Sequence, residues 1–204
     1  MQATQSGKSL KTFMSGIWGD HPIFSMLLGI CSALAVSNTV ANALAMGAGV
    51  TFVLLASGFL ISLLRSLIPM RVRMITYMVV VASFVIIVDR ALHALVPDVR
   101  QAIGPYVGLI ITNCIIMGRA EAFCIQNTVG QSLIDAIANG LGYTYTLVSI
   151  AVVRELLGFG TILGFQVMPA GFTKWVIMAM APGAFFLLAL FIWITRTIAG
   201  MEES

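Results

Sequence analysis

Long apolar stretches, separated by short segments that hold most of the polar and basic residues, form the pattern of this chain. A helix needs about 20 mostly apolar residues to cross the hydrocarbon core of a bilayer, and several stretches reach that length. The pattern predicts an all-α integral membrane protein with six transmembrane helices. The expected spans, placed to within several residues, are Pro22 to Ser37, Val40 to Leu64, Met74 to Leu95, Gly104 to Gly118, Leu133 to Leu157 and Trp175 to Thr195.

The first and fourth of these spans are shorter than the others. At 1.5 Å per residue each covers roughly 20 to 25 Å, which is less than the hydrocarbon thickness of about 30 Å. We expect short or broken helices at both places. Ordinary spans that are tilted or misplaced along the sequence are the alternative, and hydropathy alone does not separate the two.

Composition excludes a water-soluble protein. Hydrophobic residues make up 59% of the 204 residues, charged residues only 9%, and the mean hydropathy is +1.01, whereas soluble domains carry roughly 25% charged residues. Six spans use nearly the whole length, which predicts a single membrane domain over residues 1–204. The net charge of +3 arises mainly from Lys and Arg at span ends. It therefore indicates orientation in the membrane and excludes a nucleic-acid-binding role.

The basic residues predict the orientation of the spans. With a cytoplasmic segment over residues 1–19, most Lys and Arg residues fall on the cytoplasmic side, and both termini lie there. A cleavable signal peptide is the competing interpretation, because Lys8 and Lys11 precede an apolar run that reaches Ala33-Leu34-Ala35. Hydrophobicity resumes within a few residues of that triplet, which favours an uncleaved multi-pass protein.

An internal repeat relates the two halves of the chain. At an offset of 93 residues (144 − 51), five identities fall in one nine-residue window: Ala43, Ala45, Gly47, Gly49 and Thr51 match Ala136, Ala138, Gly140, Gly142 and Thr144. Three spans separate the two copies, so the second copy enters the membrane from the opposite side. We expect two inverted three-helix repeats, over about residues 20–97 and 102–198, with functional groups where the repeats meet.

Each repeat carries one cysteine about ten residues into its short span. A helical rise places Cys31 and Cys114 roughly 14 to 15 Å deep, near the bilayer midplane, from opposite sides. A lone buried cysteine is usually a small hydrophobe, but pairing through the repeat favours a thiolate metal site. Because a [2Fe-2S] cluster normally needs four thiolates, these two predict a partner chain that supplies the others. Cys124, the third cysteine, lies outside this pair and is interpreted as structural.

Acidic residues inside the spans are candidates for an ion pathway, since burying a charge there costs roughly 2.5 to 3.5 kcal/mol on insertion scales. Asp135, which aligns with Asn42 in the repeat, opens the fifth span, where a carboxylate can attract sodium near the cytoplasmic face. Asp89 lies near the outer end of the third span. The alternative for both is a charge at a helix end, facing the membrane interface.

Two further charged pairs accompany the spans. Arg119 and Glu121 follow the second cysteine closely and are expected to pair with each other or with a neighbouring protein of a complex. Arg154 and Glu155 are expected to mark the end of the fifth span and to face the membrane interface.

The stretches around the cysteines resemble a known family. Leu28-Gly29-Ile30-Cys31-Ser32-Ala33-Leu34-Ala35-Val36 and the segment Gly108 to Phe123 are similar to D subunits of sodium-translocating NADH:quinone oxidoreductases. The resemblance covers nearly the whole chain except the N-terminal dozen residues and the tail. E subunits of the Rnf complex are the near relatives. They tend to have proline after the first cysteine, so Ser32 favours the sodium-pump type.

This resemblance implies a membrane component of a translocase in the bacterial inner membrane, with no catalytic residue and no complete active site in this chain. It implies a [2Fe-2S] cluster within the membrane, held by Cys31, Cys114 and two cysteines of the homologous, oppositely oriented E subunit. The complex would contain the A, B, C and F subunits as well. Electrons from NADH would cross the bilayer through the cluster on their way to quinone, coupled to Na⁺ export. No flavin or NAD would bind to this chain.

Two other classes of function stay open at this point. An inverted repeat with short midplane helices also builds ion carriers that perform no redox chemistry. A scaffold protein that only holds its partners is the other alternative. Neither depends on Cys31, so variants of that cysteine separate them from an electron relay.

Overall fold

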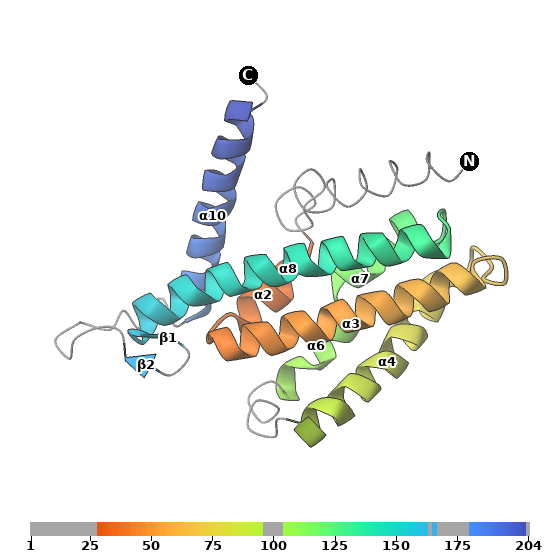
Figure 1. Cartoon of the computed structure of the whole chain (residues 1–204), viewed down its shortest axis with the longest axis horizontal. Coiled ribbons are helices and arrows are strands. Elements are labelled where there is room, and N and C mark those ends of the chain that lie inside the picture. Colours follow the sequence, from red (N-terminus) through yellow and green to blue (C-terminus); the bar gives the residue numbers. More distant parts are fainter. Residues whose placement is uncertain (1–27, 96–103, 163–164, 167–179, 203–204) are drawn as a thin grey trace.

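The computed structural model describes residues 28–95, 104–162, 165–166 and 180–202, and these form an assembly of helices (Figure 1). The helices are α2 (Ile30–Val36), α3 (Val40–Leu64), α4 (Arg73–Leu95), η2 (Gly104–Tyr106), α6 (Gly108–Ile111), α7 (Cys114–Arg119), the π-helix η3 (Ala120–Cys124), α8 (Val129–Gly158) and α10 (Ala181–Glu202). After α8, the two-residue strands β1 (Thr161–Ile162) and β2 (Phe165–Gln166) pair antiparallel.

Four segments of the described chain are long and apolar enough to cross a membrane. They are Val40–Leu64, Arg73–Leu95, Gly104–Cys124 and Val129–Gly158, and Pro182–Thr195 is a shorter apolar helix. The all-α, multi-pass architecture is therefore confirmed. The predicted starts of the first and last spans, at Pro22 and Trp175, lie outside the described residues.

Three predicted spans have nearly the expected bounds. Helix α3 begins and ends as predicted, α4 begins one residue earlier than predicted, and α8 starts at Val129 instead of Leu133. The start of α3 has a clear local cause, since the side chain of Thr39 accepts a hydrogen bond from the backbone N–H of Asn42 at 3.4 Å.

The fourth span is broken, as predicted. It consists of short helices interrupted at Thr112 and Asn113, and it ends in the π-helix η3. Asn113 begins the second part, because its Oδ1 accepts a hydrogen bond from the N–H of Ile115 at 3.2 Å. In the first span, α2 has only seven residues and follows Gly29, whose φ of 84° lies in the left-handed region.

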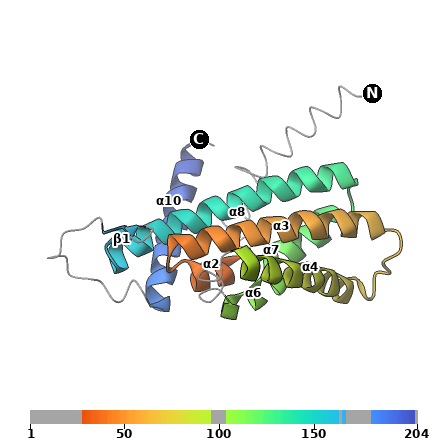
Figure 2. The ribbon, with the colours of Figure 1, turned by 60° about the horizontal axis from the view of Figure 1, so that its bottom comes forward.

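Helices α3 and α8 form the central pair, and both views show them side by side (Figures 1 and 2). They run antiparallel, because the N–H of Val40 at the start of α3 donates to Glu155 near the end of α8. At the other end of the pair, Ser62 of α3 donates to the carbonyl of Asn127, just before α8 begins. This opposed direction is what an inverted repeat requires.

The two helices cross at equivalent positions of the repeat. A Cβ added to Gly47 would lie 2.7 Å from Thr144, and a Cβ added to Gly140 would lie 2.7 Å from Thr51. Each glycine thus receives the threonine of the other repeat, and the Thr51 and Thr144 hydroxyl oxygens are 3.5 Å apart. Small residues allow this close approach, which is the usual basis of helix packing in membranes.

The remaining helices surround this pair. Helix α4 packs along α3, while α2, α6 and α7 contact the same central core. Figure 1 shows α10 extending away from the pair, and the buried Ala184 and Leu188 lie in its first half. Exposed large apolar side chains on α4 and α10 include Val79, Ile86, Phe186 and Trp193, as expected for surfaces that face lipid or a partner.

Candidate functional site

The two repeat-related cysteines lie together. Cys31 belongs to the first turn of α2 and Cys114 is the first residue of α7, and their thiols lie close enough to interact. Cys31 is exposed and Cys114 is half-buried, so the pair is open on the Cys31 side. Within the described part of the chain, no group of three or more His, Cys, Asp or Glu residues could hold a metal ion. The pair therefore offers two thiols, and the Cys31 thiol is accessible from outside the described part of the chain.

The pair lies about halfway along the central helices. In the broken span, Ile110 lies beside Gly49 of α3 and Cys124 lies beside Gly58. Cys114 comes between these two residues in sequence, so it lies at the level of the middle of α3, which runs from Val40 to Leu64.

A backbone amide points at one of the sulfurs. The N–H of Gly29 donates to Cys114 Sγ over 2.8 Å, which links the turn before α2 to the start of α7. Only glycine adopts the left-handed conformation of this turn readily. A side chain here would also meet Tyr143 Cε2 at 3.0 Å and Ile115 Cδ1 at 3.1 Å. The Leu-Gly-Ile-Cys sequence thus places an amide donor next to the second cysteine.

A buried polar chain lies next to the thiols. The Ser32 hydroxyl is 2.6 Å from the hydroxyl of Tyr143, and Asn113 Nδ2 donates to Ser32 Oγ over 3.3 Å. All three residues are fully buried. Sequence reasoning missed them. The available signal was an asparagine directly before a cysteine in an otherwise apolar run, because asparagine is a common N-cap residue.

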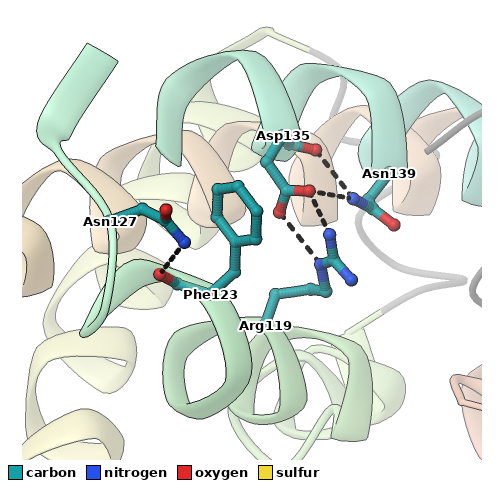
Figure 3. A network of polar contacts seen from close by, with 5 residues as sticks. All are labelled: Arg119, Phe123, Asn127, Asp135 and Asn139. Carbon is teal, nitrogen blue, oxygen red and sulfur yellow. Dashed lines mark hydrogen bonds and ion pairs between the residues drawn. The ribbon is translucent and has the colours of Figure 1, made fainter. Parts of the chain in front are cut away.

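Asp135 belongs to a second buried cluster, shown in Figure 3. Its two carboxylate oxygens accept hydrogen bonds from Arg119 Nε and Nη2, and the ion pair is almost completely buried. Asn139 Nδ2 donates to the Asp135 carboxylate over 3.0 Å, and the guanidinium of Arg119 lies 5.4 Å from the ring centre of Phe123. Asp135 is therefore not a helix-end charge at the interface but a buried partner of Arg119.

The predicted pairing of Arg119 with Glu121 is wrong. Glu121 instead forms an ion pair with Arg73 and accepts a hydrogen bond from the Tyr77 hydroxyl over 3.2 Å. Residues two apart on a helix do not face each other, which explains why the two neighbours have different partners.

The structure does not bring Asp89 and Asp135 together. Asp89 is half-buried in the C-terminal part of α4, about 24 Å along the helix from Arg73 at 1.5 Å per residue. Arg73 lies at the same end of the molecule as Arg119, since it pairs with nearby Glu121. The two candidate ion-pathway residues thus lie toward opposite ends of the bundle, as the sequence pattern predicts.

Arg154 and Glu155 do not face the interface as expected. Both are buried, with 2% and 4% of their surface exposed. Arg154 donates to the Leu34 carbonyl at the end of α2 and to the Ser37 hydroxyl, over 3.2 and 2.8 Å, and Glu155 accepts from the N–H of Val40. These two charges satisfy polar groups of the turn between α2 and α3, which no local pattern reveals.

Cys124 is separate from the thiol pair. It lies at the end of η3, is 3% exposed, and its Sγ would lie 3.5 Å from a Cβ on Gly58. It packs in a small cluster with Ile61, Tyr77 and Ala120. Its surroundings are those of a packed core thiol.

Comparison with known proteins agrees with this architecture. The family described as "Rnf-Nqr subunit, membrane protein" matches residues 9–192. Three relatives from Chlamydia are each named as the D subunit of a Na(+)-translocating NADH-quinone reductase. The protein of Chlamydia abortus is 42% identical over 213 residues, which covers 100% of this chain and 99% of the relative. Those of Chlamydia caviae and Chlamydia pneumoniae are each 43% identical, covering 95% and 94% of this chain and 94% and 95% of the relatives. This chain therefore belongs to the Rnf-Nqr family of membrane subunits.

Proposed function

We propose that this chain is the D-type subunit of a Na⁺-translocating NADH:quinone oxidoreductase in the bacterial inner membrane, with both termini cytoplasmic. In this proposal Cys31 and Cys114 supply two of the four thiolates of a [2Fe-2S] cluster. The homologous E subunit supplies the other two, and the A, B, C and F subunits complete the complex. The chain relays electrons across the bilayer and has no active site of its own.

One observation carries the proposal. Two cysteines that are 83 residues apart in sequence (114 − 31) have adjacent thiols, halfway along the central helix pair. Two neighbouring thiols fit half of the donor set of a [2Fe-2S] cluster, which takes four. The exposed side of Cys31 leaves the pair accessible to a partner chain. A second chain with the same architecture would complete the set.

When bound, the cluster would supply a one-electron relay between the two sides of the membrane. The residues of this chain would hold and tune it. Cys31 and Cys114 bind it, and the Gly29 N–H bonded to Cys114 Sγ stabilises negative charge on that sulfur. The buried side chains of Ile115 and Ile116 exclude water from the base of the site.

Sodium passage along this chain remains a separate prediction for Asp135 and Asp89. In the described structure both carboxylate oxygens of Asp135 are bound to Arg119, so a cation would have to replace that guanidinium. The buried Oδ1 of Asn139 has no hydrogen-bond partner among the described residues. Na⁺ is a hard cation that prefers oxygen ligands of this kind.

The direct test is the iron content and the electron paramagnetic resonance spectrum of the purified complex. We expect Cys31→Ala and Cys114→Ala to remove two iron atoms per complex and to abolish NADH-driven quinone reduction. Cys124→Ala is the matched control and should retain both, because that thiol packs in the core away from the pair. Unchanged iron in both Cys31→Ala and Cys114→Ala would overturn the proposal.

The same variants test the alternatives. An ion carrier without redox chemistry would contain no iron here and would still transport after Cys31→Ala. A scaffold protein would assemble and leave activity intact. For an E-type chain of an Rnf complex, reduction of the cluster would depend on ferredoxin in place of NADH as the electron donor, which assays of the purified complex with each donor and acceptor would show.

A further inference from the structure

We propose that Tyr143 of α8 is a positioning residue for the thiol pair: it holds the Gly29 N–H against Cys114 Sγ and so sets the reduction potential of the cluster. This inference rests on the proposed function. Tyr143 is fully buried, lies close to both cysteines, and comes from α8, which reaches α2 through Ser32 and α7 through the Arg119–Asp135 ion pair.

The hydrogen-bond pattern determines the direction of each bond. A serine hydroxyl has one proton and two lone pairs. Ser32 donates its proton to the Gly29 carbonyl over 3.0 Å and accepts from Asn113 Nδ2. With the Ser32 proton on the Gly29 carbonyl, the 2.6 Å contact with Tyr143 uses the second lone pair and Tyr143 is the donor. The proton and both lone pairs of the Ser32 hydroxyl are then used in hydrogen bonds, so the hydroxyl has no freedom to rotate.

This chain of bonds ties both cysteine-bearing turns to α8. Ser32 fixes the carbonyl of Gly29, while Asn113 caps α7 through the N–H of Ile115. The Tyr143 hydroxyl is the anchor that joins these two hydrogen-bonded turns to a long helix. Because buried polar networks of this kind are rigid when every member is satisfied, the anchor defines the relative position of the two turns.

The ring of Tyr143 acts on the same glycine. Its Cε2 and Cδ2 would lie 3.0 and 3.4 Å from a Cβ on Gly29, so the ring edge rests directly against that residue. The left-handed backbone of Gly29 is confined between this ring and the Ser32 bond to its carbonyl. The amide of Gly29 consequently keeps its aim at Cys114 Sγ, over 2.8 Å.

An amide that points at a cluster sulfur changes the potential of the cluster. Hydrogen bonds to the sulfurs stabilise the more negative, reduced form and raise the potential. A loosened Gly29 amide makes a longer and weaker bond, so the potential becomes more negative. A residue that only filled space would leave the potential unchanged.

The experiment is a redox titration of the purified complex, followed by electron paramagnetic resonance, with Tyr143→Phe. We expect full iron content, a midpoint potential shifted to a more negative value, and changed g values. Ser32→Ala removes the acceptor of the same bond and should shift the potential in the same direction. Because both variants break one chain, the double variant should shift it no further than the larger single shift.

Tyr145→Phe is the matched control. This tyrosine lies two residues further along α8 and is 67% exposed, away from the thiols, so its hydroxyl should not affect the potential. If Tyr143→Phe lost iron from an otherwise complete complex, Ser32→Ala would supply the measured shift, and the loss would itself indicate failed positioning.

Two results separate this inference from the proposed function. Wild-type spectrum and potential in both Tyr143→Phe and Ser32→Ala, with iron present, would overturn the role of Tyr143 and leave the cluster assignment intact. Iron that is absent from the wild-type complex, or unchanged after Cys31→Ala and Cys114→Ala, would overturn the cluster assignment itself.

Discussion

The two cysteine-bearing helices occupy equivalent places in the repeat but are held by different chemistry. Helix α7 ends in Arg119, which forms a buried ion pair with Asp135 of α8. Helix α2 has no charge of its own and receives Arg154 from α8 at its last turn. In both cases a guanidinium lies at the last turn of a short helix.

Side chains of α8 bind both short helices, α2 and α7. Asp135, Tyr143 and Arg154 lie along it at separations of 8 and 11 residues (143 − 135 and 154 − 143), or about 12 and 16 Å. They contact the end of α7, the thiol turns and the end of α2, respectively. At the ends of α7 and α2, the repeat therefore preserves the place of a positive charge but not the helix that supplies it. The charge comes from α7 itself in one case and from α8 in the other. The predictions below test that difference.

The largest effect is expected at the ion pair. Asp135→Ala leaves Arg119 buried without its carboxylate, which should cost roughly 3 to 5 kcal/mol in the free energy of unfolding. The thermal unfolding midpoint of the purified complex and its yield measure this loss. Replacing both partners, as in Arg119→Met with Asp135→Leu, should recover much of it. A single variant as stable as the wild type would mean that the α7 tie is dispensable.

The tie of α2 should be weaker, because the Leu34 carbonyl and the Ser37 hydroxyl that Arg154 binds are neutral. Arg154→Leu leaves the Leu34 carbonyl and the Ser37 hydroxyl without this donor, at a cost of roughly 1 to 3 kcal/mol. The same thermal unfolding measurement applies. Arg65→Leu is the control, since Arg65 also donates to a backbone carbonyl, that of Asn127, but at an exposed position. A greater loss than in Asp135→Ala would reverse the order of the two ties.

The helix crossing, by contrast, should respond equally from both sides. Gly47→Ala and Gly140→Ala each push a Cβ to 2.7 Å from a threonine of the other repeat, which should cost roughly 1 to 3 kcal/mol in each case. Gly130→Ala on α8 meets nothing within 4 Å and should be nearly neutral. Clearly unequal losses for the first two would show that the symmetry is geometric but not energetic.

The smallest effect concerns the threonine hydroxyls at this crossing. Each already donates to its own helix, Thr51 to the Gly47 carbonyl and Thr144 to the Gly140 carbonyl, over 2.7 and 2.8 Å. A double-mutant cycle with Thr51→Ala and Thr144→Ala should therefore give a coupling of only about 0.6 kcal/mol. A coupling several times larger would make the hydroxyl pair, and not the close backbone approach, the main contact between the repeats.

The spans were predictable where the apolar run and its boundaries agree. Helix α3 follows this rule, since an uninterrupted apolar stretch lies between the cap at Thr39 and the charge at Arg65. The exact break in the fourth span was not predictable, because the sequence from Gly108 to Met117 is apolar apart from Thr112, Asn113 and Cys114. Asn113 caps the second part locally, and its side chain also donates to Ser32, which is 81 residues away.

The cysteine pair was predictable from the repeat, whereas the residues that support it were not. Each repeat places a short span with a cysteine before its long span, and this shared order brings Cys31 and Cys114 to one place. It says nothing of Tyr143, whose hydroxyl meets a side chain 111 residues away. The predictions for the charged residues were wrong for the same reason. Arg119, Arg154 and Glu155 have their partners on other helices and not among their neighbours in sequence.

The wide spacing of the crossing residues also dictates an order of assembly. Thr51 and Thr144 are 93 residues apart, and at 5 to 20 residues per second a ribosome needs roughly 5 to 19 s to make that stretch. Arg119 and Asp135 are only 16 residues apart, so their pair becomes available almost as soon as the second half emerges. The first half must therefore wait in the membrane with its glycine face uncovered until the whole of α8 has been translated.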